Sequence, residues 1–329
     1  MLNTPIHKIF IRTDASRQLG MGHIYRCLAL WEEMKDHDAT IFVCKDYPVS
    51  ADLYKQRGAM YETVEDADDF IRICAERQPE LIIIDMLDTQ RDYIESLQKT
   101  GAKVVTFEDL GEGAEAADLV VNDLYKNVKL AKHRQLSGLR NAIISPLFEQ
   151  FKPVELREKV DHILITYGGT DPSHLTEHAL NGLQRTEFKG HVTVILGPGR
   201  PEEGIDLDTY GLHGDVLKNV TDMPSIMKKA DLALCSAGRT ITELMTLGIP
   251  MLVMCQNMKE LMHTHANCQY GVINLGLGTL VSVDTLANHI ELFTHYDIRR
   301  TLHERALYEI SERSNHNVVE RILSCLGEA

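Results

Sequence analysis

The sequence predicts an α/β protein made of two doubly wound domains, each with its own parallel sheet. Short apolar segments bounded by turn residues alternate with segments whose apolar residues recur at helical spacing. This alternation begins near the amino terminus and begins again at residue 162. A strand, a helix and a further strand in succession form a right-handed unit of a parallel sheet. Each half of the chain should therefore form one such sheet.

The predicted strands of the first half are short and apolar: Lys8–Arg12, Thr40–Cys44, Leu81–Asp85, Lys103–Phe107, Leu119–Val121 and Ala142–Ile144. Those of the second half follow the same pattern: His162–Thr166, His191–Leu196, Gly214–Val216, Leu232–Cys235, Met251–Met254 and Val272–Asn274. Helical spacing fills most of the gaps, as at Ile24–Met34, Asp69–Glu76 and Arg91–Lys99, and returns from Arg299 onward. Residues 145–155 form the predicted linker. We therefore predict domains at residues 1–150 and 151–329, with the terminal helices packing back on the first domain.

Composition limits the class of function. At 329 residues and 44% hydrophobic content, the chain is long enough for two cores. The net charge of -14 argues against binding to nucleic acid or to an anionic membrane, although local donors can still hold an anionic small molecule. No apolar run approaches the roughly 20 residues that span a bilayer, and no basic and apolar leader opens the sequence. We expect a cytoplasmic protein whose partner is a small molecule; these patterns predict no oligomeric state.

The seven cysteines and fifteen histidines predict neither a disulfide framework nor a metal centre. The number of cysteines is odd, and no CxxC pair occurs. His263 and His265 are two positions apart, which on a helix would point them to different sides, and His174 and His178 have no third ligand nearby in the sequence. We expect these four histidines to be solvated or hydrogen-bonded, and we predict no metal and no cofactor.

The segment after the first strand carries the most distinctive side chains of the first half. Gly20 and Gly22 would let the backbone approach a ligand closely, and His23 would lie at the start of a helix, where negative charge is favoured. A histidine there is biased toward the neutral imidazole, which accepts a proton at pH 7. His23 is thus a candidate base, Asp14 could orient His23 or the bound ligand, and Arg26 is a candidate substrate ligand. The alternative is an ordinary strand-to-helix turn with a solvated histidine.

Two acidic loops follow later strands of the first half. Asp85 and Asp88 could act as acids, bases or hydroxyl acceptors, or could cap the next helix. Glu108, Asp109 and Glu112 could recognise a sugar or form a solvated loop. Open α/β sheets bind ligands at the carboxyl ends of their strands. We therefore expect these loops to lie together, with the carboxyl edges of the two sheets facing a central cleft.

Two loops of the second half have the composition of a phosphate site. Gly168, Gly169 and Thr170 directly follow a strand, where paired glycines allow backbone N–H groups to approach a phosphate and the hydroxyl adds a donor. A second strand ends in a polar turn, whose N–H groups and hydroxyls can hold a diphosphate, and Glu243 one helical turn later can accept both hydroxyls of a ribose. The candidate nucleotide ligands are Ser236, Ala237, Gly238, Arg239, Thr240 and Glu243. The alternative is a plain connection between a strand and a helix.

With these residues in view, the chain resembles nucleotide-sugar enzymes of the GT-B fold. The resemblance rests on three runs: Gly20-Met-Gly-His23, Gly168-Gly-Thr-Asp171, and Ser236-Ala-Gly-Arg-Thr-Ile-Thr-Glu243 with Gly248-Ile-Pro250. In the order of its elements the chain is similar, over most of its length, to the group that contains the UDP-sugar hydrolase of pseudaminic acid biosynthesis and spore-coat polysaccharide glycosyltransferase-like proteins. It is more distantly similar to the N-acetylglucosaminyltransferase of peptidoglycan synthesis.

This resemblance implies a fold, a donor and a reaction. The fold would be GT-B-like, with two Rossmann-like domains facing a central cleft and UDP bound to the second. It implies that Glu243 binds the ribose, that Gln256 and Asn257 bind the sugar or nucleotide, and that the start of the helix before Glu243 binds the diphosphate. His23 matches the catalytic histidine of the hydrolase, which acts on UDP-2,4-diacetamido-2,4,6-trideoxy-β-L-altrose and releases the sugar for synthesis of a nonulosonic, sialic-acid-like acid.

Two departures from the family pattern lie in the first half. Leu87 stands where the hydrolase has a tyrosine that faces the sugar, and Glu108-Asp109 replaces paired aspartates. They leave the identity of the sugar open, and also whether the acceptor is water or another hydroxyl. The alternatives are a hydrolase, a glycosyltransferase acting on a glycan or lipid, and a non-catalytic nucleotide binder. The donor could carry UDP or CMP.

Overall fold

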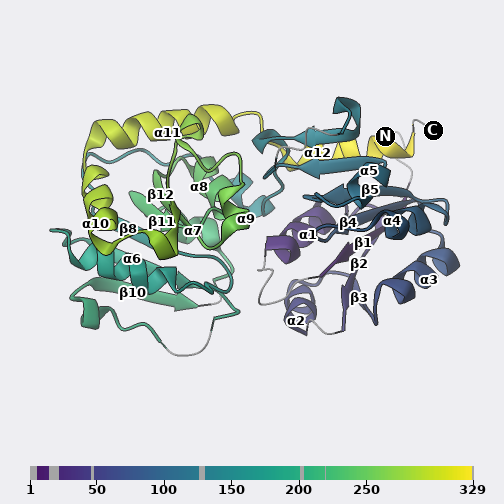
Figure 1. The fold of residues 1–329 in the computed structure, drawn as a ribbon, viewed down its shortest axis with the longest axis horizontal. Coiled ribbons are helices and arrows are strands. Elements are labelled where there is room, and N and C mark those ends of the chain that lie inside the picture. Colours follow the sequence, from purple (N-terminus) through teal and green to yellow (C-terminus); the bar gives the residue numbers. More distant parts are fainter. Residues whose placement is uncertain are drawn as a thin grey trace. The chain divides into compact units, whose positions relative to one another are not determined.

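The computed structural model describes residues 6–14, 22–45, 48–125, 130–200, 204–218 and 220–327 (Figure 1). Its contacts divide the chain into two compact units. The first unit comprises Met1–Pro146 together with Arg313–Ala329, and the second comprises Leu147–Glu312. The last helix of the chain therefore belongs to the first unit.

The first unit is built on a seven-stranded sheet in the order β3-β2-β1-β4-β5-β6-β7, and every pairing in it is parallel. Its strands are β1 (Lys8–Thr13), β2 (Asp38–Cys44), β3 (Tyr61–Val64), β4 (Leu81–Asp85), β5 (Lys103–Phe107), β6 (Leu119–Asn122) and β7 (Gln135–Ser137). Its helices are α1 (Gly22–Glu33), α2 (Pro48–Gln56), α3 (Ala67–Arg77), α4 (Arg91–Gln98), α5 (Gly113–Ala116) and α12 (Asn315–Leu323).

The second unit is built on a six-stranded parallel sheet in the order β10-β9-β8-β11-β12-β13. Its strands are β8 (His162–Thr166), β9 (His191–Leu196), β10 (His213–Lys218), β11 (Leu232–Cys235), β12 (Met251–Cys255) and β13 (Val272–Leu277). Its helices are α6 (Leu175–Gln184), α7 (Met223–Met227), α8 (Thr240–Leu247), α9 (Met258–Leu261), α10 (Val283–Leu292) and α11 (Tyr296–Ile310). The prediction of two parallel-sheet α/β domains is confirmed.

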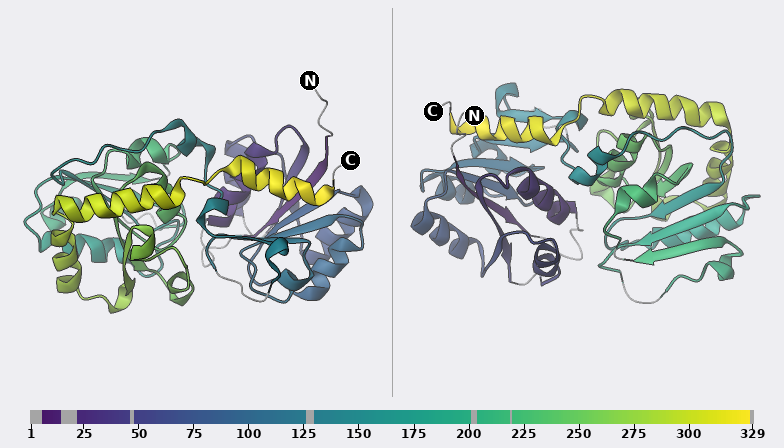
Figure 2. Two further views of the ribbon diagram at one scale, coloured as in Figure 1. Left: turned by 90° about the horizontal axis from the view of Figure 1, so that it is seen from above. Right: turned by 180° about the vertical axis from the view of Figure 1, so that it is seen from behind.

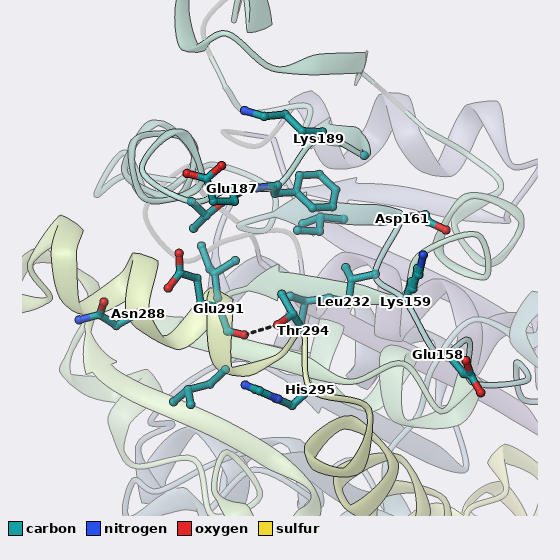
Figure 3. Close-up of a pocket in the computed structure, with 17 residues that line it drawn as sticks. Glu158, Lys159, Asp161, Glu187, Lys189, Leu232, Asn288, Glu291, Thr294 and His295 are labelled. Carbon is teal, nitrogen blue, oxygen red and sulfur yellow. Dashed lines mark hydrogen bonds between the residues drawn. The ribbon is translucent and has the colours of Figure 1, made fainter.

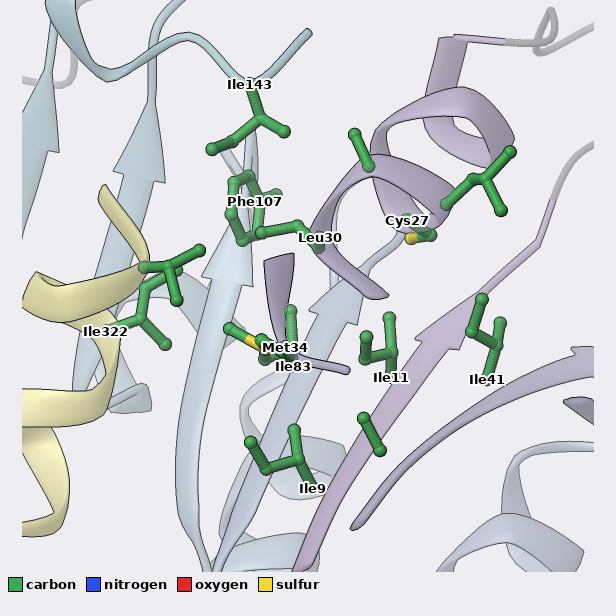
Figure 4. Packing of buried hydrophobic residues seen from close by; sticks show 14 of the residues in the cluster. Ile9, Ile11, Cys27, Leu30, Met34, Ile41, Ile83, Phe107, Ile143 and Ile322 are labelled. Carbon is green, nitrogen blue, oxygen red and sulfur yellow. The ribbon is translucent and has the colours of Figure 1, made fainter. Parts of the chain in front are cut away.

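The core of the first unit joins elements from both ends of the chain (Figure 4). Ile9 and Ile11 of β1 and Leu30 of α1 are fully buried, as is Ile322 of α12. Each side chain of this size contributes about 1.5–3 kcal/mol when it is removed from water. Figure 2 lets the reader follow α12, drawn in yellow, where it packs on α1.

One strand was wrongly predicted, and two short strands of the structure were not predicted. The segment Ala142–Ile144 was predicted as a strand but pairs with none of the described strands, and the side chain of Asn315 binds the backbone of Ile144. The Asn315 Oδ1 accepts the N–H of Ile144 at 3.2 Å, and its Nδ2 donates to the Ile144 carbonyl at 2.8 Å. The strands β3 and β7 were not predicted, since each is short and lies at an edge of the sheet.

The two sheets share a topology that positions their ligand sites. In the first sheet β1 lies between β2 and β4, and in the second sheet β8 lies between β9 and β11. The order of the strands therefore reverses at β1 and at β8. Open α/β sheets bind ligands outside the carboxyl ends of the strands at such a reversal. The carboxyl ends of β1, β4, β8 and β11 therefore occupy the expected positions for a site. Within the described part of the chain, no helix is both long and apolar enough to cross a bilayer.

Candidate functional site

A buried cluster of charged side chains lies at the carboxyl edge of the first sheet. His23 and Arg26 come from the beginning of α1, Asp85 ends β4, and Glu108 and Asp123 directly follow β5 and β6. All five side chains belong to residues that are less than a tenth exposed. They meet because parallel strands end at the same edge of the sheet and α1 begins there.

His23 is oriented by a carboxylate. Its Nδ1 lies 2.5 Å from Oδ1 of Asp85, and Nη2 of Arg26 lies 3.1 Å from the same nitrogen. The shorter contact, to an ionised carboxylate, places the imidazole proton on Nδ1. Nε2 is then the basic nitrogen. An imidazole held in one tautomer by a buried carboxylate has the arrangement that general-base catalysis requires.

Asp85 is kept ionised by Arg26. The Nε and Nη2 atoms of Arg26 donate to Oδ2 and Oδ1 of Asp85, each at 2.5 Å, and the guanidinium lies 5.0 Å from the ring centroid of Phe107. Burial alone would raise the pKa of Asp85, but the neighbouring Arg26 and His23 hold that pKa well below its usual range. Arg26 therefore acts on His23 through Asp85.

Two further carboxyl groups surround the guanidinium. Nη1 of Arg26 donates to Oε1 of Glu108, and Oδ1 of Asp123 lies 3.9 Å from Nη1. Burial raises the pKa of Glu108 to about 8 and also raises the pKa of Asp123. Burial thus favours the neutral forms of Glu108 and Asp123, whereas the lowered pKa of Asp85 makes it the anionic partner of Arg26.

Several predicted residues of the first domain have other contacts than expected. Oδ2 of Asp14 accepts from Nη2 of Arg12 at 2.9 Å, and its Oδ1 accepts the N–H of Cys44 at 3.1 Å. The carboxylate that orients His23 is thus Asp85 rather than Asp14. Arg26 and Asp85, predicted as substrate ligands, are turned inward and are at most 1% exposed. Gly22 opens α1, whereas Gly20 lies outside the described residues.

In the loop for which a solvated arrangement was the alternative, Glu108 and Asp109 are buried and Glu112 is exposed. Glu108 contacts Arg26, and Asp109 accepts the N–H groups of Thr89 at 3.0 Å and of Gly111 at 2.8 Å. Asp109 thereby ties the loop after β4 to the loop after β5. Asp85 caps no helix either, since α4 begins after Gln90.

In the second unit, Asp171 caps the helix that follows the predicted phosphate loop. Its carboxylate accepts the N–H of Leu175 at 2.9 Å and of Thr176 at 3.0 Å, at the beginning of α6. Nη1 of Arg200 also donates to it, at 2.9 Å. These N–H groups of α6 are therefore already satisfied, and any contribution of Gly169 and Thr170 to binding stays a prediction.

The loop after β8 is packed tightly against the loop after β9. The carbonyl of Gly169 accepts the N–H of Gly199 at 2.9 Å. A Cβ atom added to Gly197 would lie 2.3 Å from that same carbonyl oxygen. Because backbone atoms face each other here, only glycine fits at position 197, and the packing fixes the shape of the loop that contains Gly168 and Gly169.

The turn between β11 and α8 is braced from the segment after β12. Oε2 of Glu260 accepts the N–H of Ala237 at 3.2 Å and the N–H of Gln256 at 2.7 Å. Nδ1 of His263 donates to the carbonyl of Ala237 at 2.5 Å. The predicted turn residue Ser236 is buried, and Gly238, Arg239 and Thr240 are partly exposed. This turn is thus a well-fixed element at the reversal point of the second sheet.

Glu243 lies in the first turn of α8, where its position was predicted. Burial raises the pKa of its carboxyl group to about 7. Among the described residues, no side chain forms an ion pair with it. A carboxyl group that is largely desolvated and lacks a cation is an acceptor prepared for a polar ligand.

Gln256 and Asn257 have structural contacts. Nε2 of Gln256 donates to the carbonyl of Tyr167 at 3.1 Å and to Oδ1 of Asp171 at 2.8 Å, which joins the loop after β12 to the loop after β8. Oδ1 of Asn257 accepts the N–H of Glu260 at 3.1 Å and so caps α9. Substrate binding by either residue stays a prediction.

Glu260 was not singled out from the sequence, and His263 was predicted only to be solvated or hydrogen-bonded. A signal for Glu260 is present, because Asn257 and Glu260 have the spacing of a capping box, in which a carboxylate reaches back over the start of its helix. In the structure it reaches one residue further, to the N–H of Gln256. Its contact with Ala237 joins residues 23 positions apart, which no local pattern predicts.

The expected behaviour of the histidines holds in part. His174 is exposed and His263 is hydrogen-bonded. His265 is wrongly predicted: it is 1% exposed, neither ring nitrogen has a hydrogen-bond partner among the residues that the structure describes, and burial lowers its pKa to about 3. Within the described residues, no three cysteine, histidine, aspartate or glutamate side chains are grouped as metal ligands.

A cavity of about 800 Å³ lies at the other end of the second sheet, near the starts of β8 and β11 (Figure 3). Its lining includes Lys159, Phe188, Lys189, Leu232 and His295. None of the predicted site residues lines it. Because parallel sheets bind ligands at the carboxyl ends of their strands, this cavity is distinct from the candidate site.

Comparison with known proteins defines the class of fold. Residues 162–286 match the glycosyltransferase family 28 C-terminal domain. The structure of MurG from Acinetobacter baumannii is similar with a TM-score of 0.69 at 16% identity, covering 96% of this chain and 99% of that chain. The calicheamicin glycosyltransferase CalG4 is similar with a TM-score of 0.64 at 13% identity, covering 98% of this chain and 99% of that one. The protein has the GT-B fold and is glycosyltransferase-like.

Sequence relatives confirm the resemblance that the loop motifs indicated. The chain is 24% identical to the spore coat polysaccharide biosynthesis protein SpsG of Bacillus subtilis, over 89% of this chain and 91% of that protein. It is 25% identical to the UDP-2,4-diacetamido-2,4,6-trideoxy-beta-L-altropyranose hydrolase of Campylobacter jejuni, over 75% of this chain and 91% of that protein. An uncharacterized protein of Methanocaldococcus jannaschii is 27% identical over 85% of this chain, which spans only 66% of that relative's length.

Proposed function

We propose that this protein hydrolyses a UDP-linked amino or diacetamido-deoxy sugar to the free sugar and UDP. The observation that carries the proposal is the 2.5 Å contact between Nδ1 of His23 and Asp85. It leaves Nε2 of His23 as a base that can take a proton from water. The water oxygen then bonds to the anomeric carbon while the bond from that carbon to the phosphate oxygen breaks.

The leaving group receives its stabilisation from the second unit. We assign the diphosphate to the turn from Ser236 to Thr240 and the ribose hydroxyls to Glu243. The guanidinium of Arg239 and the backbone N–H groups at the start of α8 would offset the negative charge that develops on UDP. UDP is a good leaving group, so placing the water and accepting its proton supply most of the required catalysis.

The class of sugar is proposed by analogy. The hydrolase relative acts on a UDP-linked diacetamido-trideoxy sugar, as its name states, and the SpsG relative belongs to polysaccharide biosynthesis. A free diacetamido sugar is suited to condensation into a nonulosonic acid. Leu87 stands in place of a tyrosine that faces the sugar in the hydrolase. The identity of the sugar is therefore the first property to determine.

The test incubates the protein with a panel of UDP- and CMP-sugars without any acceptor. Chromatography then measures the nucleotide that is released. We expect UDP release from a UDP-diacetamido sugar. Replacing His23 by alanine (His23→Ala) should slow the release by about 10²–10⁴, the usual contribution of a positioned acid or base. The control His316→Ala removes an exposed histidine of α12 and should leave the rate unchanged.

Two outcomes would contradict the proposal. Equal rates in the wild type and His23→Ala would remove His23 from the reaction. Release of UDP only after a glycan or lipid acceptor is added would favour a glycosyltransferase, the class to which the similar solved structures belong. His23 would then deprotonate the acceptor hydroxyl. Nucleotide binding without turnover of any donor would favour a binding module.

A further inference from the structure

Glu260 places a carboxylate on the turn to which we assign the diphosphate. Its Oε2 accepts the N–H of Ala237 at 3.2 Å and the N–H of Gln256 at 2.7 Å. Its other oxygen, Oε1, would lie 4.0 Å from a Cβ atom built on Gly238. The carboxylate therefore already accepts the N–H of Ala237, which is a backbone donor of the turn that would face the phosphates.

Within the described part of the chain, the carboxyl group of Glu260 lacks a basic partner. Burial and the nearby carboxylate of Asp171 raise its pKa to about 7, and the two backbone N–H groups only partly oppose that rise. No ion pair of Glu260 with a lysine, arginine or histidine occurs among the described residues. An ionised Glu260 would repel a diphosphate, which carries two negative charges, whereas a protonated Glu260 would not.

We propose that Glu260 occupies the diphosphate subsite in the absence of nucleotide and that it takes up a proton when a nucleotide sugar binds. This inference rests on the proposed nucleotide site. The proton comes from solution and converts the carboxylate to a carboxylic acid. The acid's O–H can donate to a phosphate oxygen, while its carbonyl oxygen continues to accept from the backbone. Binding of the nucleotide sugar is thus coupled to pH through one side chain.

Other ionisable groups surround this turn and define what the test must separate. Asp171 approaches from the loop after β8, His263 from the segment after α9, and Glu243 from the first turn of α8. The turn itself carries Arg239. Burial also raises the pKa of Glu243 to about 7, so Glu243 is the main competing source of pH dependence. A change confined to Glu260 separates the two.

The experiment measures the dissociation constant of UDP-N-acetylglucosamine by calorimetry from pH 6 to pH 8. The diphosphate of this probe is esterified at both ends, so its charge is constant over that range. If only protonated Glu260 admits the ligand, a pKa of about 7 makes wild-type binding about tenfold weaker at pH 8 than at pH 6. Calorimetry in buffers of different ionisation enthalpy should also detect uptake of about half a proton at pH 7.

The variant Glu260→Gln keeps the shape and the backbone contacts and removes the charge. It should bind the probe with the same affinity at pH 6 and pH 8, and at pH 8 about tenfold more tightly than the wild type. The control Glu291→Gln changes an exposed glutamate at the end of α10 and should retain the pH dependence of the wild type. Thermal melting of each variant confirms that it is folded.

The outcomes separate this inference from the proposed function. If the folded wild type binds no nucleotide sugar at any pH, the proposed nucleotide site fails. If the wild type binds with equal affinity at pH 6 and pH 8, or if Glu260→Gln keeps a tenfold pH dependence, the role of Glu260 is overturned while the nucleotide site stands.

Discussion

Arg26 illustrates how one fully buried charge determines the chemistry of a neighbour. It is 1% exposed and donates to Asp85 through two nitrogens. Burying a guanidinium is costly unless its partners are well placed, and removing one partner of such a pair leaves an uncompensated charge. Here the pair has a consequence beyond stability, because the ionised Asp85 fixes the tautomer of His23. Asp85 and Arg26 are therefore positioning residues for the proposed base.

Asp85→Asn tests this dependence. The substitution removes the charge that favours a proton on Nδ1 of His23, and it leaves Arg26 with fewer anionic partners. We expect nucleotide release to slow by roughly 10²-fold or more, with little change in KM, and the free energy of unfolding to fall by about 3 kcal/mol. Steady-state kinetics and urea unfolding measure the two effects.

The control for Asp85→Asn is Asp92→Asn, an exposed aspartate in the first turn of α4. It should alter neither the rate nor the stability appreciably. A rate for Asp85→Asn equal to that of the wild type would show that His23 does not depend on this carboxylate.

At the scale of elements, the second unit positions its loops by direct contact between backbones. The loop after β8 lies against the loop after β9 through Gly169, Gly197 and Gly199. Gln256 then joins the first of these loops to the segment after β12, and Glu260 joins that segment to the turn before α8. The loops of four strands therefore form one connected framework around the proposed nucleotide site.

Gly197→Ala tests that framework. The new Cβ would lie 2.3 Å from the carbonyl oxygen of Gly169, and a backbone atom cannot give way cheaply. We expect a loss of about 1–3 kcal/mol in the free energy of unfolding, as for other overpacked sites, together with weaker binding of UDP-N-acetylglucosamine. Urea unfolding and calorimetry measure these quantities.

Gly204→Ala is the matched control, because nothing lies within 4 Å of a Cβ added there. It should resemble the wild type in both measurements. Unchanged nucleotide binding in a destabilised Gly197→Ala variant would separate the packing of this loop from the nucleotide site.

At the scale of the whole molecule, several carboxyl groups are buried with too few favourable contacts to keep them ionised. The free energy of unfolding therefore depends on pH. Burial raises the pKa of Glu108 to about 8 and of Glu243 and Glu260 to about 7. In the unfolded chain these groups titrate near 4.3. Between the two values the folded protein binds more protons than the unfolded chain, so stability is complete below the unfolded pKa and is lost as pH rises through the folded pKa.

We therefore expect the free energy of unfolding to fall between pH 7 and pH 8.5. Histidines buried in the neutral form, such as His265, have the opposite effect, but they act mainly below pH 7. Glu108→Gln should reduce the fall, because it removes the group that is charged last. Glu112→Gln, an exposed position in the same loop, should retain it. Urea unfolding at pH 7 and pH 8.5 measures this fall. A free energy of unfolding that rises with pH in the wild type would contradict the expectation.

The family resemblance and the location of both candidate sites could be predicted because they depend on local pattern. Strand spacing placed nearly every strand of the two sheets, and the turn chemistry around His23 and before Glu243 marked the loops at the reversal points. The wrongly predicted strand at Ala142–Ile144 has a long-range cause. The backbone of Ile144 is bound by the side chain of Asn315, 171 positions away, and a strand pattern cannot reveal such a partner.

The sequence by itself determined two α/β domains, a histidine at the start of the first-domain helix and a glutamate one turn into α8. Only the tertiary structure decided that Asp85 orients His23, that Arg26 faces inward, that Asp171 occupies the start of α6, and that Glu260 reaches the turn at Ala237. The physical reason is the order of the strands in each parallel sheet. Consecutive strands are separated in the chain by a connecting segment, and β1 lies beside β4 and β8 beside β11. The partners of a side chain at the carboxyl edge therefore depend on which strands lie together rather than on nearby residues.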